Sequence, residues 1–196
     1  MTDFPTLLLA STSPYRKALL DRLGLPFACE APGVEENERS GEAPPERALR
    51  LARAKAEAVA HRHPGALVIG SDQVASYSAD GRQQVLHKPG DRQTCVNQLK
   101  LMSAQTVRFD TALAIWRNGR LIEHADITLV RFRALDDTAI HSYIDREPAF
   151  DCAGGFKIEG LGVTLFDSIE SRDPTALIGL PLIAVCAALR QLGVAV

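Results

Sequence analysis

The spacing of apolar residues in the first third of the chain predicts a strand, a helix, a short strand and a long helix. Residues 7–10 form a short apolar run that is typical of a buried strand. Tyr15, Leu19 and Leu23 then recur at helical spacing until Gly24, a residue typical of helix ends. A brief strand is expected at residues 26–30. The long helix is expected at residues 44–61, with an apolar stripe formed by Leu49, Ala52, Ala56 and Val59.

The rest of the pattern predicts strands and helices in alternation. Residues 66–70 are the clearest apolar run of the chain and predict a buried strand that ends before Ser71. A hairpin is expected at residues 106–132, because Asn118 and Gly119 form a dipeptide that favours a type I′ turn. The other expected elements are helices at 91–102, 136–144 and 181–192 and a strand at 163–169. Together they predict an α/β protein.

Composition narrows the classes of partner. The 196 residues are 46% hydrophobic and carry a net charge of -2, which suits one globular domain over residues 1–196. That charge gives no field for nucleic acid, and no apolar run approaches the roughly 20 residues that a membrane span needs. The four cysteines are far apart and form no CxxC pair, which favours reduced thiols and a cytoplasmic protein.

The corner between the first strand and the first helix has the chemistry of a phosphate site. Ser13 stands where a helix N-cap is expected, and Pro14 suits the first helical position. A helix begins with free backbone N–H groups and the positive end of its dipole, which together favour an anion. Arg16 adds donors that match phosphate oxygens, and Ser11 adds a hydroxyl.

Charged residues elsewhere supply what would surround that anion. Asp72 follows the apolar run at 66–70, and its position alone fits a functional carboxylate and a turn cap equally well. Lys55 borders the apolar stripe of the long helix, Lys88 lies in a proline turn, and Glu36 lies in an acidic loop. Carboxylates beside several cations suit a small-molecule triphosphate with a hard divalent metal. No Walker A motif and no early GxGxxG accompany them.

These residues resemble a known family. The segment from Ser11 to Arg16, then Glu36, Lys55, residues 70–73, Lys88-Pro89 and the glycine-rich residues 152–160 are similar to the motifs of the Maf family of nucleoside triphosphate pyrophosphatases, in the family's order. The resemblance extends over about residues 7–192. Within the family, residues 71–74 and 152–160 resemble the YceF-like subgroup, which implies 7-methyl-GTP as substrate.

The resemblance implies a fold, a reaction and a set of roles. The fold would be an elongated mixed β-sheet flanked by helices, with a cleft between two lobes, as in the inosine triphosphate pyrophosphatases. Water would attack the α-phosphorus with Asp72 as base, and Glu36 and Asp72 would face Mg²⁺ or Mn²⁺. The residues that would bind substrate are Ser11, Ser13, Arg16, Glu36, Lys55 and Lys88. A homodimer is compatible with the resemblance.

Three further residues concern the choice of base. A sister subgroup that prefers dTTP and UTP typically has Thr where this chain has Gln73, and Gln where it has Glu159. A carboxylate at 159 could accept hydrogen bonds from the guanine N1–H and N2–H groups, and Tyr15 could stack on a cationic methylated base. Equally, Tyr15 could simply pack against Leu19, and Glu159 could be a solvated loop residue.

Two other functions stay open at this stage. The chain could be a dTTP/UTP pyrophosphatase of the same family, or a nucleotide-sensing septation regulator with incidental hydrolysis. The sequence also departs from the family's pattern at His87, where the family usually has Gly before Lys-Pro. His tolerates a positive φ less well than Gly, so the expected consequence is an altered turn at Lys88.

Overall fold

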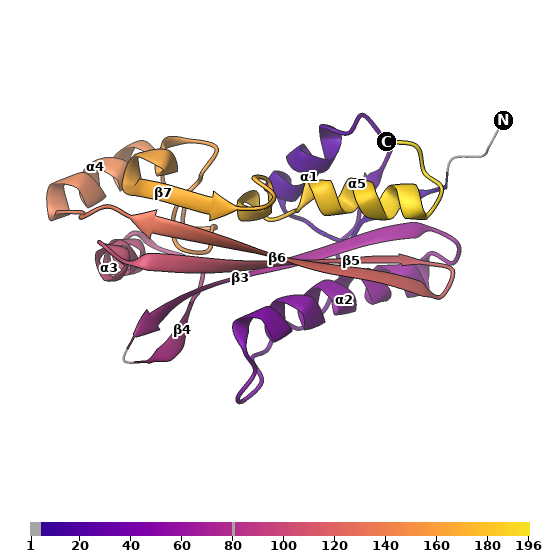
Figure 1. The fold of residues 1–196 in the computed structure, drawn as a ribbon, viewed down its shortest axis with the longest axis horizontal. Coiled ribbons are helices and arrows are strands. Elements are labelled where there is room, and N and C mark those ends of the chain that lie inside the picture. The colour runs from indigo at the N-terminus through magenta and orange to yellow at the C-terminus, as the bar shows by residue number, and fades with distance from the viewer. Residues whose placement is uncertain (1–4, 80) are drawn as a thin grey trace. The chain divides into compact units, whose positions relative to one another are not determined.

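The computed structural model describes residues 5–79 and 81–196. Within these ranges the chain forms a mixed seven-stranded sheet with the order β2-β1-β3-β5-β6-β7, in which β4 pairs with β3 (Figure 1). Five α-helices, α1 to α5, accompany the sheet. The predicted α/β class with a mixed sheet is therefore confirmed.

The described chain divides into two compact units, which are described in turn. The first comprises the described residues up to Asp72 together with Thr111–Asp126 and Asp173–Val196, and the second comprises Gln73–Asp110 and Ile127–Arg172. Three strands contribute residues to both units: β3 (Leu67–Ala79), β5 (Thr106–Arg117) and β6 (Arg120–Phe132). The prediction of a single domain over residues 1–196 is not tested by this division.

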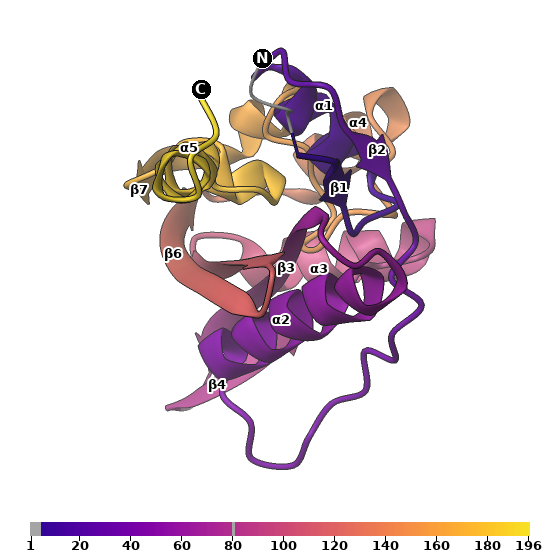
Figure 2. The same ribbon diagram turned by 90° about the vertical axis from the view of Figure 1, so that its right-hand side faces the viewer.

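The first unit is built on parallel strands. The strand β1 (Leu7–Leu9) pairs in parallel with β2 (Ala28–Cys29) on one side and with β3 on the other, where Leu8 faces Val68. The helix α2 (Pro44–Arg62) lies on one face of these strands (Figure 1). The helices α1 (Pro14–Asp21) and α5 (Leu182–Gln191) lie on the other face (Figures 1 and 2).

The core of the first unit lies between the strands and the pair α1 and α5. Its side chains come from alternate strand positions and from the inner faces of both helices, because only those positions point away from water. Fully or almost fully buried members include Leu9, Leu20, Ile69, Ile115 and Leu189. On the opposite face, Gly70 allows α2 to approach β3 very closely, since a Cβ there would lie 2.3 Å from the carbonyl oxygen of Ala52.

The second unit combines antiparallel strands with two helices. The strand β4 (Arg82–Leu86) pairs with β3, and β7 (Phe166–Ser171) pairs with β6. The helices α3 (Arg92–Met102) and α4 (Asp137–Arg146) pack together and are joined by an ion pair between Lys100 and Asp137 at 2.9 Å. Edge-to-face contacts link four phenylalanines in this unit, which are Phe109, Phe132, Phe156 and Phe166.

The structure corrects three expectations. The strand predicted at 66–70 does not end before Ser71 but continues as β3 through Asp72 to Ala79. Residues 163–165 belong to a 3₁₀ helix, η1 (Leu161–Leu165), so β7 begins three residues later than predicted. The strand β4 was not predicted at all. The Asn118-Gly119 turn is confirmed, since φ is 48° and 79° at these two residues as a type I′ turn requires.

Candidate active site

The corner between β1 and α1 has the predicted geometry. Ser13 is the N-cap of α1, its hydroxyl accepts a hydrogen bond from the backbone N–H of Arg16 at 3.4 Å, and Pro14 opens the helix. The hydroxyl of Ser11, a buried residue, accepts from the backbone N–H of Ser13 at 3.1 Å. Tyr15 is half-buried on the first turn of the helix. The sequence forms this corner because serine hydroxyls replace the helical partners that the first N–H groups lack.

Arg16 is held at this corner by a backbone carbonyl from a distant part of the chain. Its Nε donates to the oxygen of Gly179 at 2.9 Å, and this is the side-chain hydrogen bond that the structure gives it. Within residues 5–79 and 81–196, no hydrogen bond occupies the two terminal nitrogens of the guanidinium, so they can bind a ligand. Burial lowers the pKa of Arg16, while the charges of Asp72 and Glu36 act in the opposite direction. The arginine therefore stays a cation facing two carboxylates.

Lys55 joins two carboxylates from different elements. It lies on the buried face of α2, and its ammonium is 2.6 Å from Oδ1 of Asp72 on β3 and 2.6 Å from Oε1 of Glu36. Lys55 and Asp72 are both almost fully buried, whereas Glu36 is exposed. The sequence placed Lys55 only at the border of the buried face, but the structure buries it because its charge is paired there.

Asp72 is the most unusual titratable group of this cluster. Burial raises the pKa of its carboxyl, and the charges of Lys55 and Arg16 oppose that rise without cancelling it. The ion pair with Lys55 uses Oδ1, and in the described part of the chain no hydrogen bond reaches Oδ2, so this oxygen can contact water or a ligand. A buried carboxylate with a raised pKa and an unshared oxygen is typical of a general base.

Asp72 is not at the end of its strand, but it lies near the end of the part of β3 that pairs in parallel with β1. The parallel pairing of β3 with β1 ends at Ile69, where β1 itself ends at Leu9. Asp72 lies just beyond this point, and the chain leaving β1 turns there into the serine corner. The carboxylate therefore lies beyond the carboxyl end of the parallel pair, which is where α/β proteins place ligands.

The carboxylates of the cluster fit a hard divalent cation that is shared with a phosphate. Glu36 and Asp72 converge on one ammonium group, so their oxygens lie close together. Mg²⁺ is typically bound by one or two carboxylates together with substrate phosphates. Within residues 5–79 and 81–196, no group of three or more His, Cys, Asp or Glu side chains is arranged to hold a metal ion.

The turn of Lys88 lies in the second unit and is fixed from two sides. The carbonyl of His87 accepts a hydrogen bond from Gln98 of α3 at 3.0 Å, and the N–H of Gly90 donates to Phe150 at 2.9 Å. Lys88 itself is exposed. Apart from glycines, the described residues with positive φ are Ala104 and Asn118. His87 therefore does not have the positive φ that would favour glycine at this position.

The glycine-rich segment at residues 152–160 also belongs to the second unit. Its chain is held by α4, because Tyr143 accepts from the N–H of Lys157 at 3.2 Å and Glu147 accepts from that of Leu161 at 2.9 Å. Gly160 packs directly against Glu147, where any Cβ would collide with the carboxylate. Glu159 is exposed on this segment. Like Gln73 and Lys88, it lies in the second unit, and its role stays a prediction.

The structure gathers the predicted residues of the first unit into one cluster: Ser11, Ser13, Arg16, Glu36, Lys55 and Asp72. Sequence reasoning missed the loop after β7, whose Gly179 carbonyl holds Arg16. A signal for an ordered loop was present, since Asp173 is followed by Pro174 and Thr175, and Asp-Pro sequences favour turns.

Comparison with known proteins decides the family. The model of the family described as "Maf-like protein" matches residues 6–192, which is almost the whole chain. The chain belongs to the Maf family. The residues quoted above for the resemblance are thus motifs of a Maf protein, and the predicted family is confirmed.

Three curated Maf relatives match this chain over nearly its full length. A protein of Xanthomonas oryzae pv. oryzae (strain MAFF 311018) is 55% identical, and the match covers 96% of this chain and 97% of that protein. One of Bordetella avium (strain 197N) is 51% identical over 98% and 96%, and one of Hydrogenovibrio crunogenus (strain DSM 25203 / XCL-2) is 46% identical over 95% and 92%. Each of the three is named "7-methyl-GTP pyrophosphatase".

Proposed function

We propose that this Maf protein is a nucleoside triphosphate pyrophosphatase that hydrolyses 7-methyl-GTP to 7-methyl-GMP and pyrophosphate. The relatives that bear this activity as their name match it at 46–55% identity over nearly the full chain. The single observation that supports the chemistry is the pairing of a buried Asp72 with Lys55 beside the serine corner and Arg16.

In the proposed reaction, Asp72 removes a proton from the water that attacks the α-phosphorus. The ammonium of Lys55 keeps the carboxylate ionised, and the raised pKa makes it a stronger base than an exposed aspartate. Arg16, Lys55 and Lys88 balance the negative charge on the phosphates, and the N-terminus of α1 adds the positive end of its dipole. Pyrophosphate leaves when the bond between the α-phosphorus and the bridging oxygen breaks.

A divalent cation is part of the proposal. Glu36 and Asp72 would hold it together with the phosphate oxygens, and when bound it would neutralise charge on the triphosphate. Because Lys55 contacts the same two carboxylates, the ammonium keeps their oxygens together in its absence. Removal of the cation should therefore abolish turnover without unfolding the protein.

The alternative of a nucleotide-sensing protein predicts a different site. Sensing needs phosphate binding but no buried base, and it gives no reason to keep a carboxylate in a place where burial opposes its charge. The dTTP/UTP alternative uses the same chemistry and differs in the base pocket. The two alternatives can be separated from the proposal with purified protein, because they predict no turnover or a preference for dTTP and UTP. Within the described ranges, no helix has the length and apolar character of a membrane span.

A substrate panel tests the proposed function. Purified protein is incubated with 7-methyl-GTP, GTP, UTP or dTTP, with Mg²⁺, with Mn²⁺ or with excess chelator, and pyrophosphate and monophosphate are quantified. The proposal predicts the highest kcat/KM for 7-methyl-GTP, equal amounts of the two products, and no turnover in chelator. Binding without turnover would favour the sensor, a preference for UTP or dTTP would favour the sister activity, and full activity in chelator would contradict the metal.

A further inference from the structure

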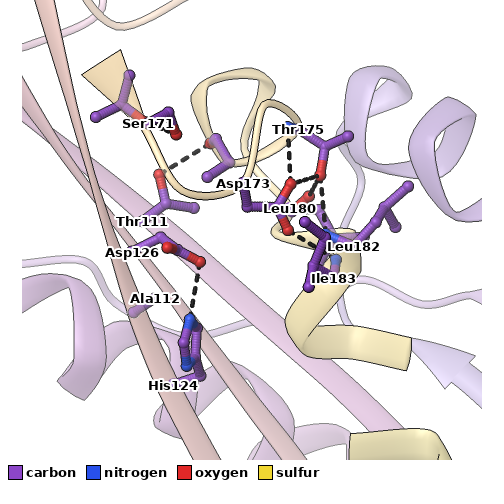
Figure 3. A network of polar contacts seen from close by, with 12 residues as sticks. Thr111, Ala112, His124, Asp126, Ser171, Asp173, Thr175, Leu180, Leu182 and Ile183 are labelled. Atoms are coloured by element: carbon purple, nitrogen blue, oxygen red, sulfur yellow. Dashed lines mark hydrogen bonds and ion pairs between the residues drawn. The ribbon is translucent and has the colours of Figure 1, made fainter. Parts of the chain in front are cut away.

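A buried carboxylate outside the candidate site organises the loop between β7 and α5. Asp173 is 2% exposed, and its two oxygens accept hydrogen bonds from different places (Figure 3). Oδ1 accepts from the N–H of Thr175 at 2.9 Å and from its hydroxyl at 2.6 Å, and Oδ2 accepts from the N–H of Ile183 at 2.7 Å. A carboxylate buried this deeply is costly unless such bonds compensate it.

Thr175 extends these contacts to the start of α5. Its hydroxyl oxygen accepts from the N–H of Leu182 at 2.8 Å and lies 2.9 Å from the carbonyl oxygen of Leu180 (Figure 3). The N-cap position of α5 is Pro181, whose side chain has no acceptor. Asp173 and Thr175 therefore accept hydrogen bonds from the first two N–H groups of α5 from outside the helix. These bonds close residues 173–183 into a ring.

The ring fixes the carbonyl that holds Arg16. Gly179 lies within it at φ +120°, a conformation that favours glycine, and a Cβ there would be 3.3 Å from Nε of Arg16. The oxygen of Gly179 accepts from Arg16 Nε at 2.9 Å and lies 2.9 Å from the hydroxyl of Ser71. Ser71 immediately precedes Asp72, so one carbonyl touches the phosphate arginine and the neighbour of the base.

A second bond holds the ring to the sheet. The hydroxyl of Thr111 on β5 donates to the carbonyl of Ala176 at 2.9 Å, inside the short 3₁₀ helix η2 (Ala176–Ile178) that leads to Gly179. The path from the carboxylate of Asp173 to the guanidinium of Arg16 thus consists of consecutive bonded groups that are all in the first unit. Any change at Asp173 that loosens the ring moves the Gly179 carbonyl.

We propose that Asp173 is a positioning residue for phosphate binding, which acts through Thr175 and the Gly179 carbonyl to aim the terminal nitrogens of Arg16. The identity of the ligand, a triphosphate chain, rests on the proposed function, whereas the test measures binding alone and does not. Asp173 does not touch the substrate. Its role differs from a merely structural one because its effect must disappear when Arg16 is no longer present.

A double-mutant cycle tests the coupling. The dissociation constant for inorganic tripolyphosphate with Mg²⁺ is measured by calorimetry for wild type, Asp173→Asn, Arg16→Ala and the double variant. An asparagine keeps the shape but replaces one acceptor with an amide that faces N–H donors. We expect Asp173→Asn to weaken binding about tenfold or more in wild type and less than about twofold without Arg16. A ratio of the two effects below about three would overturn the inference.

Two further variants protect the test against loss of folding. Thr175→Val removes the hydroxyl and should weaken binding in the same Arg16-dependent way, whereas Thr175→Ser keeps the hydroxyl and should bind like wild type. Asp136→Asn is the matched control, because Asp136 caps α4 through the N–H of Ala139 at 2.7 Å in the second unit. It should lower the melting temperature but leave binding unchanged.

Turnover of 7-methyl-GTP, measured in parallel, separates the two claims. Wild type that binds tripolyphosphate but releases no pyrophosphate would refute the proposed function, while the binding cycle still decides the role of Asp173. If wild type is active but Asp173→Asn weakens binding equally with Arg16 and with Arg16→Ala, only the positioning role is refuted. If both claims are correct, Asp173→Asn raises the KM for the nucleotide when Arg16 is present and leaves the KM unchanged in the Arg16→Ala background.

Discussion

At the scale of single residues, Asp72 is a carboxylate whose surroundings act on its pKa in opposite directions. Burial favours the neutral acid, and Lys55 and Arg16 favour the ion, with burial the larger effect. The structure keeps a charge at a position where burial opposes it, which is typical of functional sites. The sequence could indicate the position of Asp72, but its pKa depends on Lys55 and Arg16, whose approach only the fold determines.

The raised pKa of Asp72 predicts the acid side of the pH–rate profile. The carboxyl must be ionised to accept a proton from water, so kcat/KM, which reports the free enzyme, should fall as the pH falls through the raised pKa, with a midpoint above the ordinary value of 3.8. Stability has the opposite sign, since the folded state binds the proton more tightly. The contribution of this group to stability is present below pH 3.8 and is lost as the pH rises through the folded pKa.

The measurement is kcat/KM for 7-methyl-GTP between pH 3.5 and 8, with tryptophan fluorescence recorded at each pH to confirm that the protein is folded. A profile that stays flat down to about pH 3.8 in folded protein would be incompatible with Asp72 as the base.

Glu159 is the residue whose side chain should select the base. A carboxylate accepts from both N–H groups on the guanine edge, whereas the amide of a glutamine can donate to a pyrimidine carbonyl. One charge-assisted hydrogen bond contributes roughly 1.5–3 kcal/mol, so Glu159→Gln should lower the preference for 7-methyl-GTP over UTP by about ten- to a hundredfold. Glu170→Gln, at an exposed carboxylate of β7, is the control. A ratio of kcat/KM values within about twofold of wild type would refute this assignment.

At the scale of elements, the close packing of α2 on β3 brings Lys55 to Asp72. Gly70 makes this possible, because its missing side chain leaves room for the backbone of Ala52 and Ala56. The apolar stripe of α2 was predictable from its helical spacing, although Leu49 is only partly buried and Ala48 and Leu51 are buried more deeply. The spacing did not indicate that close contact between the backbones of α2 and β3 would bring Lys55 to Asp72.

Gly70→Ala should therefore damage both folding and catalysis. A methyl group at this position would lie 2.3 Å from the oxygen of Ala52, so α2 must move away from β3. Forcing a larger group into a packed interior typically costs about 1–3 kcal/mol, and a clash with backbone belongs at or above the upper end. We expect lower stability in urea and a fall in kcat/KM of at least about tenfold.

Gly65→Ala is the matched control, because Gly65 has a positive φ but open space around it. It should lose stability through backbone strain alone and keep wild-type kcat/KM. Equal kcat/KM in wild type and Gly70→Ala would show that the close approach of α2 does not matter for the reaction.

Most elements of the structure follow from local patterns, and the failures have physical causes. The hairpin turn, the cap at Ser13 and the starts of the helices near residues 91 and 136 depend on neighbouring residues, so the sequence predicted them. The length of β3 depends on distant partners, since Ser71 lies within bonding distance of the Ala112 and Gly179 carbonyls. The cause at η1 is local instead: the hydroxyl of Thr164 donates to the carbonyl of Leu161 at 2.8 Å, which favours a 3₁₀ turn over a strand.

At the scale of the whole molecule, membership of the Maf family joins the local observations into one function. The first unit carries the proposed base Asp72 with Arg16 and Lys55, and the second unit carries the predicted site residues Lys88, Gln73 and Glu159. Relatives of 46–55% identity match the chain over nearly its full length, so the match includes the residues of both units. The predicted cleft, the cytoplasmic location and the homodimer stay predictions.

The most direct test of this account compares wild type with Asp72→Asn. The variant should bind 7-methyl-GTP with a dissociation constant within about threefold of wild type, because asparagine keeps the shape and Lys55 and Arg16 still face the phosphates. Its single-turnover rate should fall about 100-fold or more, since a positioned base typically contributes that factor. Asp167→Asn, at an exposed carboxylate of β7, should behave as wild type in both measurements. An Asp72→Asn protein that binds the nucleotide and hydrolyses it at a near-normal rate would contradict the account.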